Sequence, residues 1–256
     1  MEKYASVILA AGKGTRMGSP EGSEIPKVMF KMLGKPVIWY SVKAIKDAGI
    51  KRVILIVGYK KEMVEEYMGD EVEYVTQEEQ LGTGHAAMMA ENLLKGKVET
   101  IIVFYGDNPL YKPKTIRKLI ELYENPPAGG EKPTIAMLSV VFKDPMYWCF
   151  GRIIRDMNNN VIGIVEHKDC NPEQLKICES NPGFYIIDAN WFWENGKKIE
   201  RKNVQGEFYL TDIVEIACKQ GKKIVAMPVS EESEALGINT LEQLTDAEKV
   251  LKEKLK

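Results

Sequence analysis

The chain has 256 residues, a formal net charge of −2, 45% hydrophobic residues and 28% charged residues. This composition is typical of a globular protein with enough chain to bury a large core, and the charge balance gives no basic surface for nucleic acid. Because no apolar run approaches the ~18 residues of a membrane span, we expect no membrane-spanning segment. The N-terminus runs directly into a predicted strand, so we also expect no signal peptide.

Four cysteines and two histidines are scattered along the chain. They are too dispersed for the close cluster that a structural zinc site needs, and the cysteines form no CxxC pair. Free thiols are typical of the reducing cytosol, so we expect a cytoplasmic protein. We expect a structural role for His85 and a surface strand position for His167. The cysteines are Cys149, Cys170, Cys178 and Cys218.

The first half of the chain alternates predicted strands and helices. An apolar strand at 6–11 leads into a glycine-rich loop, and a helix is bounded by Pro36 and Gly49. The other predicted elements of this half are strands at 52–57, 71–76 and 100–105 and helices at 60–68, 83–94 and 114–123. This alternation predicts a doubly wound, mostly parallel, Rossmann-like α/β sheet, on which ligands bind beyond the carboxyl ends of the strands. The polar loops predicted at that edge are 11–18, 77–84 and 105–109.

The second half has a mixed pattern and follows a loop at 125–133 that is rich in proline and glycine. Thr240 and Gln243 have capping-box spacing and precede an apolar helical stripe. We therefore expect one domain over 1–239, with a small mixed β subregion, and an appended helix over 240–256. The predicted elements are strands at 134–142, 182–187 and 223–229, a hairpin of 151–156 and 161–167, and a helix at 209–219.

The sequence LAAGKGTRM, residues 9–17, places Gly12 and Gly14 directly after the first predicted strand. Backbone N–H groups of such a loop, with two cations inside it and Lys27 downstream, suit a polyphosphate. The loop is not a Walker loop, which requires GxxxxGK followed by Ser or Thr. It also fails the dinucleotide fingerprint, because Gly18 comes one residue late and the second strand ends without a carboxylate. On spacing alone, a solvated glycine turn with surface cations remains the alternative.

Blocks in order along nearly the whole chain carry a family resemblance. The glycine loop with Pro26-Lys27 downstream resembles the signature of the sugar-phosphate nucleotidyltransferases. QEEQLGTGHA at 77–86 resembles the uridine-reading loop of the bacterial N-acetylglucosamine-1-phosphate uridyltransferases, and YGDNPL at 105–110 resembles their metal-binding segment. The further matching blocks are GRI at 151–153, VEHKD at 165–169, ESN at 179–181, EFYLTD at 207–212 and GIN at 237–239.

The resemblance implies transfer of a uridylyl group from UTP to N-acetylglucosamine 1-phosphate, with release of pyrophosphate and with Mg²⁺ as cofactor. Chemistry of this kind rests mostly on positioning and charge stabilisation. The implied catalytic residues are Arg16, Lys27 and Asp107, and the implied metal ligands are Asp107 and Asn239. The implied nucleotide-binding residues are Leu9, Ala10, Ala11, Gly12, Gly14, Lys27, Gln77, Gln80, Gly82 and Thr83. The implied sugar-binding residues are Tyr105, Gly106, Gly151, Glu166, Asn181 and Tyr209.

Several of these residues also have simpler interpretations. Asp107 is typical of a turn, Asn239 of a helix entry and Thr83 of a helix N-cap. Glu166 alone is typical of a solvated strand end. The resemblance leaves a monomer and a dimer open.

The chain departs from the family pattern in four places. Segment 18–25 is longer than expected and predicts a flap beside the phosphates, Pro182 stands where threonine is more usual, and Phe208 stands where tyrosine is frequent. The hexapeptide periodicity of a β-helix acetyltransferase domain is absent, so we expect the uridyltransferase part alone. The alternatives are another sugar 1-phosphate such as glucose 1-phosphate, another phosphorylated acceptor or nucleoside triphosphate, and a non-catalytic domain that binds a nucleotide sugar. The failed fingerprint argues against a dehydrogenase.

Overall fold

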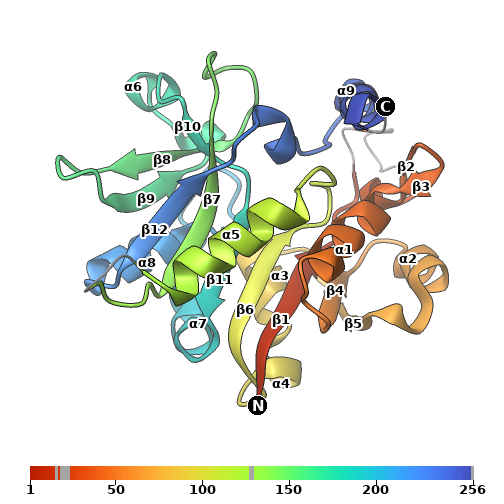
Figure 1. Cartoon of the computed structure of the whole chain (residues 1–256), viewed down its shortest axis with the longest axis horizontal. Coiled ribbons are helices and arrows are strands. Elements are labelled where there is room, and N and C mark those ends of the chain that lie inside the picture. The colour runs from red at the N-terminus through yellow and green to blue at the C-terminus, as the bar shows by residue number, and fades with distance from the viewer. Residues whose placement is uncertain (15–16, 18–23, 127–129, 255–256) are drawn as a thin grey trace.

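The computed structural model describes residues 1–14, 17, 24–126 and 130–254. Arg16, most of the predicted 18–25 flap and part of the predicted 125–133 loop lie outside the described residues. The described strands form one large sheet and a short two-stranded ribbon, with helices packed around them (Figure 1). This arrangement confirms the predicted α/β class.

The strands fall into a parallel half and a mixed half. The large sheet contains β1 (Glu2–Leu9), β4 (Val53–Val57), β5 (Glu73–Thr76), β6 (Val98–Tyr105), β7 (Ile135–Val141), β8 (Gly151–Arg155), β9 (Val161–Val165), β10 (Glu179–Asn181), β11 (Phe184–Asp188) and β12 (Ile224–Pro228). Their order is β5-β4-β1-β6-β11-β7-β10-β8-β9, with β12 paired to β7. The ribbon consists of β2 (Lys31–Met32) and β3 (Lys35–Pro36). The predicted hairpin of β8 and β9 is confirmed, and the mixed β subregion forms the far end of the same sheet.

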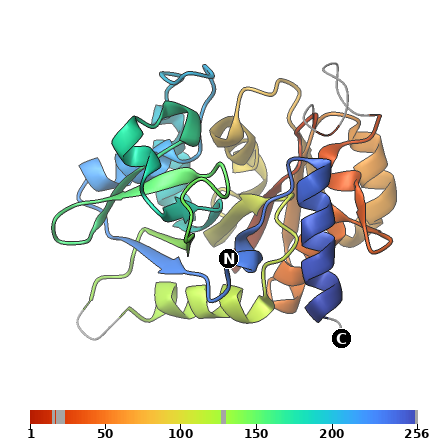
Figure 2. The same ribbon diagram turned by 90° about the horizontal axis from the view of Figure 1, so that it is seen from above.

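Helices lie on both faces of the sheet (Figure 2). One face packs against α1 (Val37–Asp47), α2 (Lys61–Met68) and α5 (Pro113–Glu124). The other face packs against α3 (Thr83–Met88), α4 (Glu91–Leu94), α7 (Ala189–Asn195) and α8 (Asp212–Lys219). The remaining helices are α6 (Pro172–Leu175) and α9 (Leu241–Lys254), and α9 lies beside the ribbon (Figure 1).

Local sequence signals account for several helix ends. Pro36 stands at the N-cap of α1, and Gly49 follows its end with a φ of 103°, which favours glycine. The predicted helix at 83–94 is instead two helices, α3 and α4.

The predicted strand position of His167 is wrong, because β9 ends at Val165. The chain turns after this strand, and the Asp169 N–H donates to the Glu166 carbonyl.

Helix α8 begins three residues later than the predicted helix at 209–219. The Phe208 N–H donates to the Leu81 carbonyl at 2.8 Å, and the Phe208 carbonyl accepts from the Gly84 N–H at 2.7 Å. These long-range bonds hold the backbone before α8 in an extended pairing that a helix would break. Helix α7 was not predicted, although the Asp188 side chain caps it by accepting from the Trp191 N–H.

The strand order creates a crevice at the carboxyl ends of β1 and β6. β1 pairs in parallel with β4 on one side and with β6 on the other, so the chain reverses its direction of winding at β1. Leu9 and Tyr105 are register partners at the ends of β1 and β6. Ligands of open α/β sheets bind at such a switch point. The loops that follow β1 and β6 are therefore the first place to look for a site.

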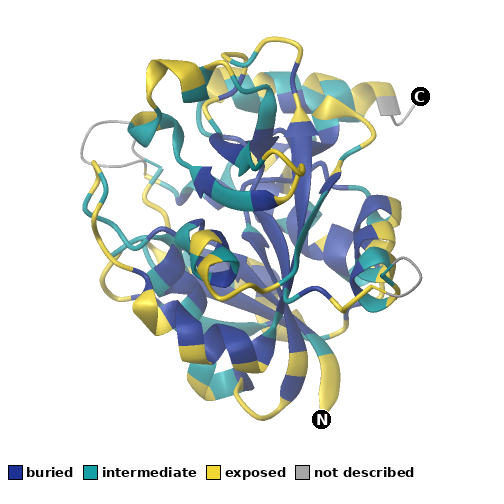
Figure 3. Ribbon diagram, turned by 90° about the vertical axis from the view of Figure 1, so that its left-hand side faces the viewer, coloured by how far each residue is buried: buried dark blue, intermediate teal, exposed yellow. Residues whose placement is uncertain are grey.

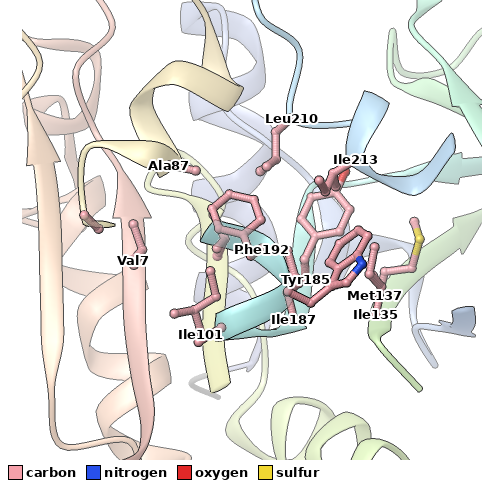
Figure 4. Close-up of a cluster of buried hydrophobic side chains, with 14 of the residues drawn as sticks. Val7, Ala87, Ile101, Ile135, Met137, Tyr185, Ile187, Phe192, Leu210 and Ile213 are labelled. Atoms are coloured by element: carbon pink, nitrogen blue, oxygen red, sulfur yellow. The ribbon is translucent and has the colours of Figure 1, made fainter. Parts of the chain in front are cut away.

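The core has one layer of apolar side chains on each face of the sheet. Buried residues follow the strands, while the outer sides of the helices are exposed (Figure 3). The layer under α3, α7 and α8 includes Val7, Ile101, Tyr185 and Phe192 (Figure 4). A third cluster packs α9, through Ala247, against Met32 of the ribbon and neighbouring side chains. Within the described part of the chain, no helix has both the length and the apolar character that crossing a membrane requires.

Candidate active site

A cavity of about 870 Å³ opens at the switch point between β1 and β6. All three predicted polar loops contribute to its wall. Of the site residues predicted from the sequence and described in the structure, all but one line this cavity. The exception is Gly106, whose N–H donates to the Leu9 carbonyl at 2.9 Å beneath the cavity. A Cβ at Gly106 would lie 2.8 Å from Ile38 Cδ1, so this glycine serves close packing of the strand end.

Three polar side chains converge beyond the end of β6. The Lys27 ammonium donates to Asp107 Oδ2 and, at 3.1 Å, to Asn239 Oδ1. Asp107 is only 9% exposed, and its side chain follows directly on the strand end and a turn. Asp107 therefore occupies the predicted turn and also lines the cavity. Asn239 comes from the other end of the chain, and the structure brings it to this pair.

Two local features hold Asn239 there. The Ile238 N–H donates to the Asp107 carbonyl at 2.9 Å, which ties the segment before α9 to the end of β6. At the start of α9, the Gln243 N–H donates to Thr240 Oγ1 at 3.2 Å, as the predicted capping box requires. The Gln243 side chain accepts from the Asn239 N–H at 2.8 Å, one residue before the expected position. The contacts at the start of α9 therefore hold Asn239 in place, and its position before the helix is compatible with a role in the site.

The glycine loop packs directly on Lys27. Gly14 has a φ of 68°, and a Cβ at this residue would lie 2.9 Å from Lys27 Cβ. A larger residue would displace either the loop or the lysine. Gly12 has no atom within 4 Å of the position of a Cβ and faces open space in the cavity. The loop thus presents backbone beside the partly buried Lys27 ammonium, an arrangement suited to a phosphate chain.

The loop after β5 is organised by the buried side chain of Gln77. Its amide nitrogen donates to the Gly82 carbonyl at 3.2 Å and lies 2.9 Å from His85 Nδ1. His85 thus helps to orient Gln77, which agrees with the structural role expected for it. Gln77 is only 3% exposed, so most of its side chain is packed inside the loop and little of it faces the cavity.

Gly82 allows this loop to approach the segment before α8. Its φ is 115°, and a Cβ would lie 2.6 Å from the Phe208 carbonyl oxygen. We expect Gly82→Ala to lower the free energy of unfolding by about 2 kcal/mol, because both the backbone conformation and the contact oppose a side chain. Urea unfolding followed by circular dichroism measures this change. Gly12→Ala is the control, and a change above about 0.5 kcal/mol there would contradict the steric argument.

The interpretation of Thr83 as a helix N-cap is wrong. Gly82 occupies the N-cap position of α3, and no side chain caps the helix. The Thr83 hydroxyl instead accepts from the Leu210 N–H at 3.0 Å, across the cavity wall. It also interacts with Tyr105, whose pKa is raised well above its ordinary value by burial and by the nearby Glu166. Thr83 therefore joins the loop after β5 to the segment before α8.

The far end of the cavity is lined by Glu166, Asn181, Gly151 and Tyr209. Thr211 Oγ1 donates to Glu166 Oε1 at 3.1 Å, and burial raises the pKa of the Glu166 carboxyl. Glu166 is thus a partly buried wall residue and not a solvated strand end. A Cβ at Gly151 would lie 3.3 Å from Glu166 Oε2, so the glycine leaves this carboxylate uncovered.

Asn181 is held from both sides of its amide. Its nitrogen donates to the Tyr185 hydroxyl at 2.6 Å, and its oxygen accepts from the Gly183 N–H at 3.1 Å. Pro182, where threonine was expected, presents its carbonyl to Asn108 Nδ2 at 2.7 Å and to the Tyr111 hydroxyl at 3.2 Å. The atypical residue therefore contributes a backbone acceptor to a buried network beneath the cavity.

This cavity combines a phosphate-suited loop, a paired lysine and carboxylate, and a distal wall of carboxylate and amide groups. A family model described as "Nucleotidyl transferase" matches residues 5–237. The chain belongs to the nucleotidyl transferase family. The predicted family resemblance is thereby confirmed.

Individual proteins agree with this membership. The chain is 45% identical over 255 residues to the bifunctional protein GlmU of Caldanaerobacter subterraneus subsp. tengcongensis, covering 100% of this chain and 53% of that protein. It is 40% identical to the bifunctional protein GlmU of Acetivibrio thermocellus, again covering 100% of this chain and 53% of that protein. The nucleotidyltransferase chain described here thus spans about half the length of these curated relatives.

Solved structures show the same fold. A UDP-glucose pyrophosphorylase complexed with UDP-glucose superposes with a TM-score of 0.81 at 21% identity, covering 99% of this chain and 100% of that chain. A putative glucose-1-phosphate thymidylyltransferase from Bacillus anthracis, in complex with a sucrose, has a TM-score of 0.76 at 22% identity, covering 96% and 94%. The predicted fold is therefore that of the nucleotidyltransferases.

A smaller cavity of about 350 Å³ adjoins the nucleotidyltransferase cavity and shares Glu166 and Tyr209 with it. The Tyr209 hydroxyl and Asp169 Oδ2 are buried there and have no hydrogen-bond partner among the described residues. Burial, and then the charges of Glu215 and Asp169, raise the pKa of Asp212 in this cavity to about 6. The wall of this smaller cavity thus carries two carboxyl groups, Glu166 and Asp212, whose pKa values are raised because burial disfavours their charged forms.

The raised pKa of Asp212 predicts a pH-dependent stability. Its ordinary pKa is 3.8, so the folded chain holds the proton more tightly, and this stabilisation is lost as pH rises through about 6. Asp212→Asn stays neutral, so we expect its Tm to exceed that of the wild type by about 2–4 °C at pH 8, with a smaller difference at pH 5. Calorimetry at both pH values measures this, with the exposed Asp70→Asn as control. An equal effect of Asp212→Asn at both values would contradict the assignment.

Proposed function

We propose that this chain transfers the uridylyl group of UTP to N-acetylglucosamine 1-phosphate, giving UDP-N-acetylglucosamine and pyrophosphate. Identity of 40–45% to the GlmU proteins over the whole of this chain, which covers 53% of theirs, supports this activity and acceptor. The neighbours whose titles name UDP-glucose and glucose 1-phosphate share the fold, and we keep glucose 1-phosphate as the competing acceptor. The free cysteines support the expected cytoplasmic location.

The observation that carries the proposal is the convergence of Lys27, Asp107 and Asn239 at one end of the cavity. These residues lie far apart in the sequence, and Asn239 comes 212 positions after Lys27. A cation, a carboxylate and an amide oxygen beside a glycine loop form the set that phosphoryl transfer requires for positioning and charge stabilisation. A domain that only binds a nucleotide sugar has less need of this complete set.

The chemistry of two oxygen donors supports a divalent cation at this place. Asp107 Oδ2 and Asn239 Oδ1 already converge on one positive charge, the Lys27 ammonium. Mg²⁺ prefers one or two protein oxygens together with substrate phosphates and water, which this pair allows. Among the described residues, no group of three or more His, Cys, Asp or Glu side chains is arranged to hold a metal. In this proposal Asp107 and Asn239 hold Mg²⁺, and its chemistry is neutralisation of phosphate charge.

The residues near the glycine loop bind the triphosphate. Backbone groups of Gly12 and Gly14 face the phosphates, and Lys27 and Arg16 neutralise the charge that develops during transfer. An oxygen of the sugar 1-phosphate attacks the α-phosphorus, and the bond to pyrophosphate breaks. The oxygen is anionic, so no proton has to be removed from it and no covalent enzyme intermediate is needed.

The two ends of the cavity select the two substrates. On the nucleotide side, Gln77 and Thr83 face the uracil, and the contacts of Gln77 with Gly82 and His85 fix its orientation. On the sugar side, Glu166 and Asn181 accept and donate hydrogen bonds to hydroxyl and acetamido groups. A charged Glu166 accepts hydrogen bonds from sugar hydroxyls with both oxygens, whereas a protonated Glu166 would also donate one.

Pyrophosphate release tests the proposal. Purified protein with Mg²⁺ is assayed with UTP, CTP, dTTP and ATP, each combined with N-acetylglucosamine 1-phosphate, with glucose 1-phosphate and without acceptor. We expect release with UTP and N-acetylglucosamine 1-phosphate well above every other pair. Preference for glucose 1-phosphate, or for another nucleotide, would replace the substrate assignment. No release with any pair, together with measurable nucleotide binding by calorimetry, would favour a non-catalytic domain.

A further inference from the structure

Arg152 is a fully buried cation next to the sugar end of the cavity. It is the second residue of β8, and its side chain has no exposed surface. Gly151, the residue before it, lines the cavity, whereas Arg152 itself does not. Arg155 on the same strand is paired with Glu179 at 2.7 Å, but Arg152 pairs with no carboxylate of the described residues. Burying a guanidinium without a paired carboxylate costs free energy, so hydrogen bonds to other groups must compensate for it.

The guanidinium binds mainly to backbone carbonyls. Nη1 donates to the Phe150 carbonyl and, at 3.4 Å, to Ser180 Oγ. Nη2 donates to the Pro145 carbonyl at 2.5 Å. Nε has no partner in the described part of the chain. Two of these acceptors thus belong to the segment 142–150, which connects β7 to β8.

The segment 142–150 forms part of the cavity wall. It has no helix or strand, so no regular ladder holds its backbone groups. Cys149 and Phe150 at its end line the cavity beside Gly151. Trp148 Nε1 donates to the Gly237 carbonyl at 3.2 Å, two residues before Asn239. The segment therefore runs from the sugar end of the cavity to the Lys27, Asp107 and Asn239 cluster.

We propose that Arg152 is a positioning residue for acceptor binding, because its guanidinium holds the carbonyls of Pro145 and Phe150 and so fixes the wall that faces the phosphorylated sugar. A rigid donor fork suits this task, since one guanidinium reaches both carbonyls at once. The uracil-facing residues Gln77 and Thr83 lie on the loop after β5, and none of the Arg152 hydrogen-bond acceptors in the described part of the chain belongs to that loop. The expected effect on KM rests on the proposed function. The expected ordering of the backbone of 142–150 by Arg152 does not.

Steady-state kinetics and hydrogen–deuterium exchange test the proposal on Arg152→Met and Arg152→Lys. We expect Arg152→Met to raise the KM for N-acetylglucosamine 1-phosphate by about tenfold or more, because small displacements of a binding wall are costly. The KM for UTP should change by less than about twofold. Exchange in 142–150 should become faster in both variants, with the smaller change in Arg152→Lys, which keeps the charge and reaches one carbonyl. The control is Arg155→Met, which removes a cation from the same strand and should leave this segment and both KM values unchanged.

Equal changes in both KM values, unchanged exchange in 142–150, or the same pattern in Arg155→Met would overturn the positioning role. If Arg152→Met does not fold, Arg152→Lys carries the same test with both readouts. If the wild-type chain does not turn over this substrate pair, the proposed function fails. The exchange experiment then still decides whether Arg152 orders the wall.

Discussion

Asp107→Asn should abolish nearly all turnover while leaving the fold intact. We expect kcat/KM to fall by about 10³-fold, which corresponds to ~4 kcal/mol of transition-state stabilisation. The substitution keeps the shape of a side chain that is only 9% exposed, but it removes the charge that faces Lys27 and Asn239. Initial rates of pyrophosphate release over a range of N-acetylglucosamine 1-phosphate concentrations, at saturating UTP, measure the effect.

The exposed Asp70→Asn is the control for this experiment, since it removes the same charge far from the cavity lining. Its kcat/KM should equal that of the wild type. A loss of less than about tenfold in Asp107→Asn, with unchanged Tm, would mean that Asp107 is a turn residue without a catalytic role.

Lys27→Met should have two opposite effects. Turnover should fall by about 10²-fold or more, because Lys27 is a partly buried cation beside the glycine loop. In the absence of nucleotide, however, the affinity for Mn²⁺ should rise by about five- to tenfold, because a positive charge that competes for Asp107 and Asn239 has been removed. Electron paramagnetic resonance of free Mn²⁺ measures this affinity directly.

The exposed Lys31→Met, four residues further along the chain, is the matched control and should change neither quantity. Unchanged Mn²⁺ affinity in Lys27→Met would show that Asp107 and Asn239 do not form the cation site. The same result with a large loss of turnover would leave Lys27 as a phosphate ligand only.

Local patterns were sufficient for most of the parallel half of the fold. The apolar run before Gly58 predicts a buried strand, observed as β4, and Pro36 with Gly49 correctly predicts α1. These elements follow from short-range rules: apolar runs make buried strands, proline starts helices and glycine ends them. The place of β11 between β6 and β7 follows from no such rule, because it depends on long-range pairing.

The candidate site residues come from the family motifs, and the structure adds contacts that local patterns cannot show. Taken alone, Asn239 is a helix-entry residue, and long-range contacts such as the bond from the Ile238 N–H to the Asp107 carbonyl bring it to the cavity. Thr83 is a plausible cap, but its partner Leu210 is 127 positions away. Arg152 belongs to the matching block GRI, but neither this block nor the predicted strand indicates its burial, because an arginine is normally exposed. Contacts of this range are decided by tertiary packing and not by spacing.

The most direct test of the account is the identity and amount of the product. Wild-type protein is incubated with UTP, N-acetylglucosamine 1-phosphate and Mg²⁺, and both products are quantified by mass spectrometry and an enzymatic pyrophosphate assay. We expect UDP-N-acetylglucosamine and pyrophosphate in equal amounts, and about a thousandfold slower formation of both with Asp107→Asn. Pyrophosphate without the nucleotide sugar, or full consumption of UTP by the Asp107 variant, would contradict it.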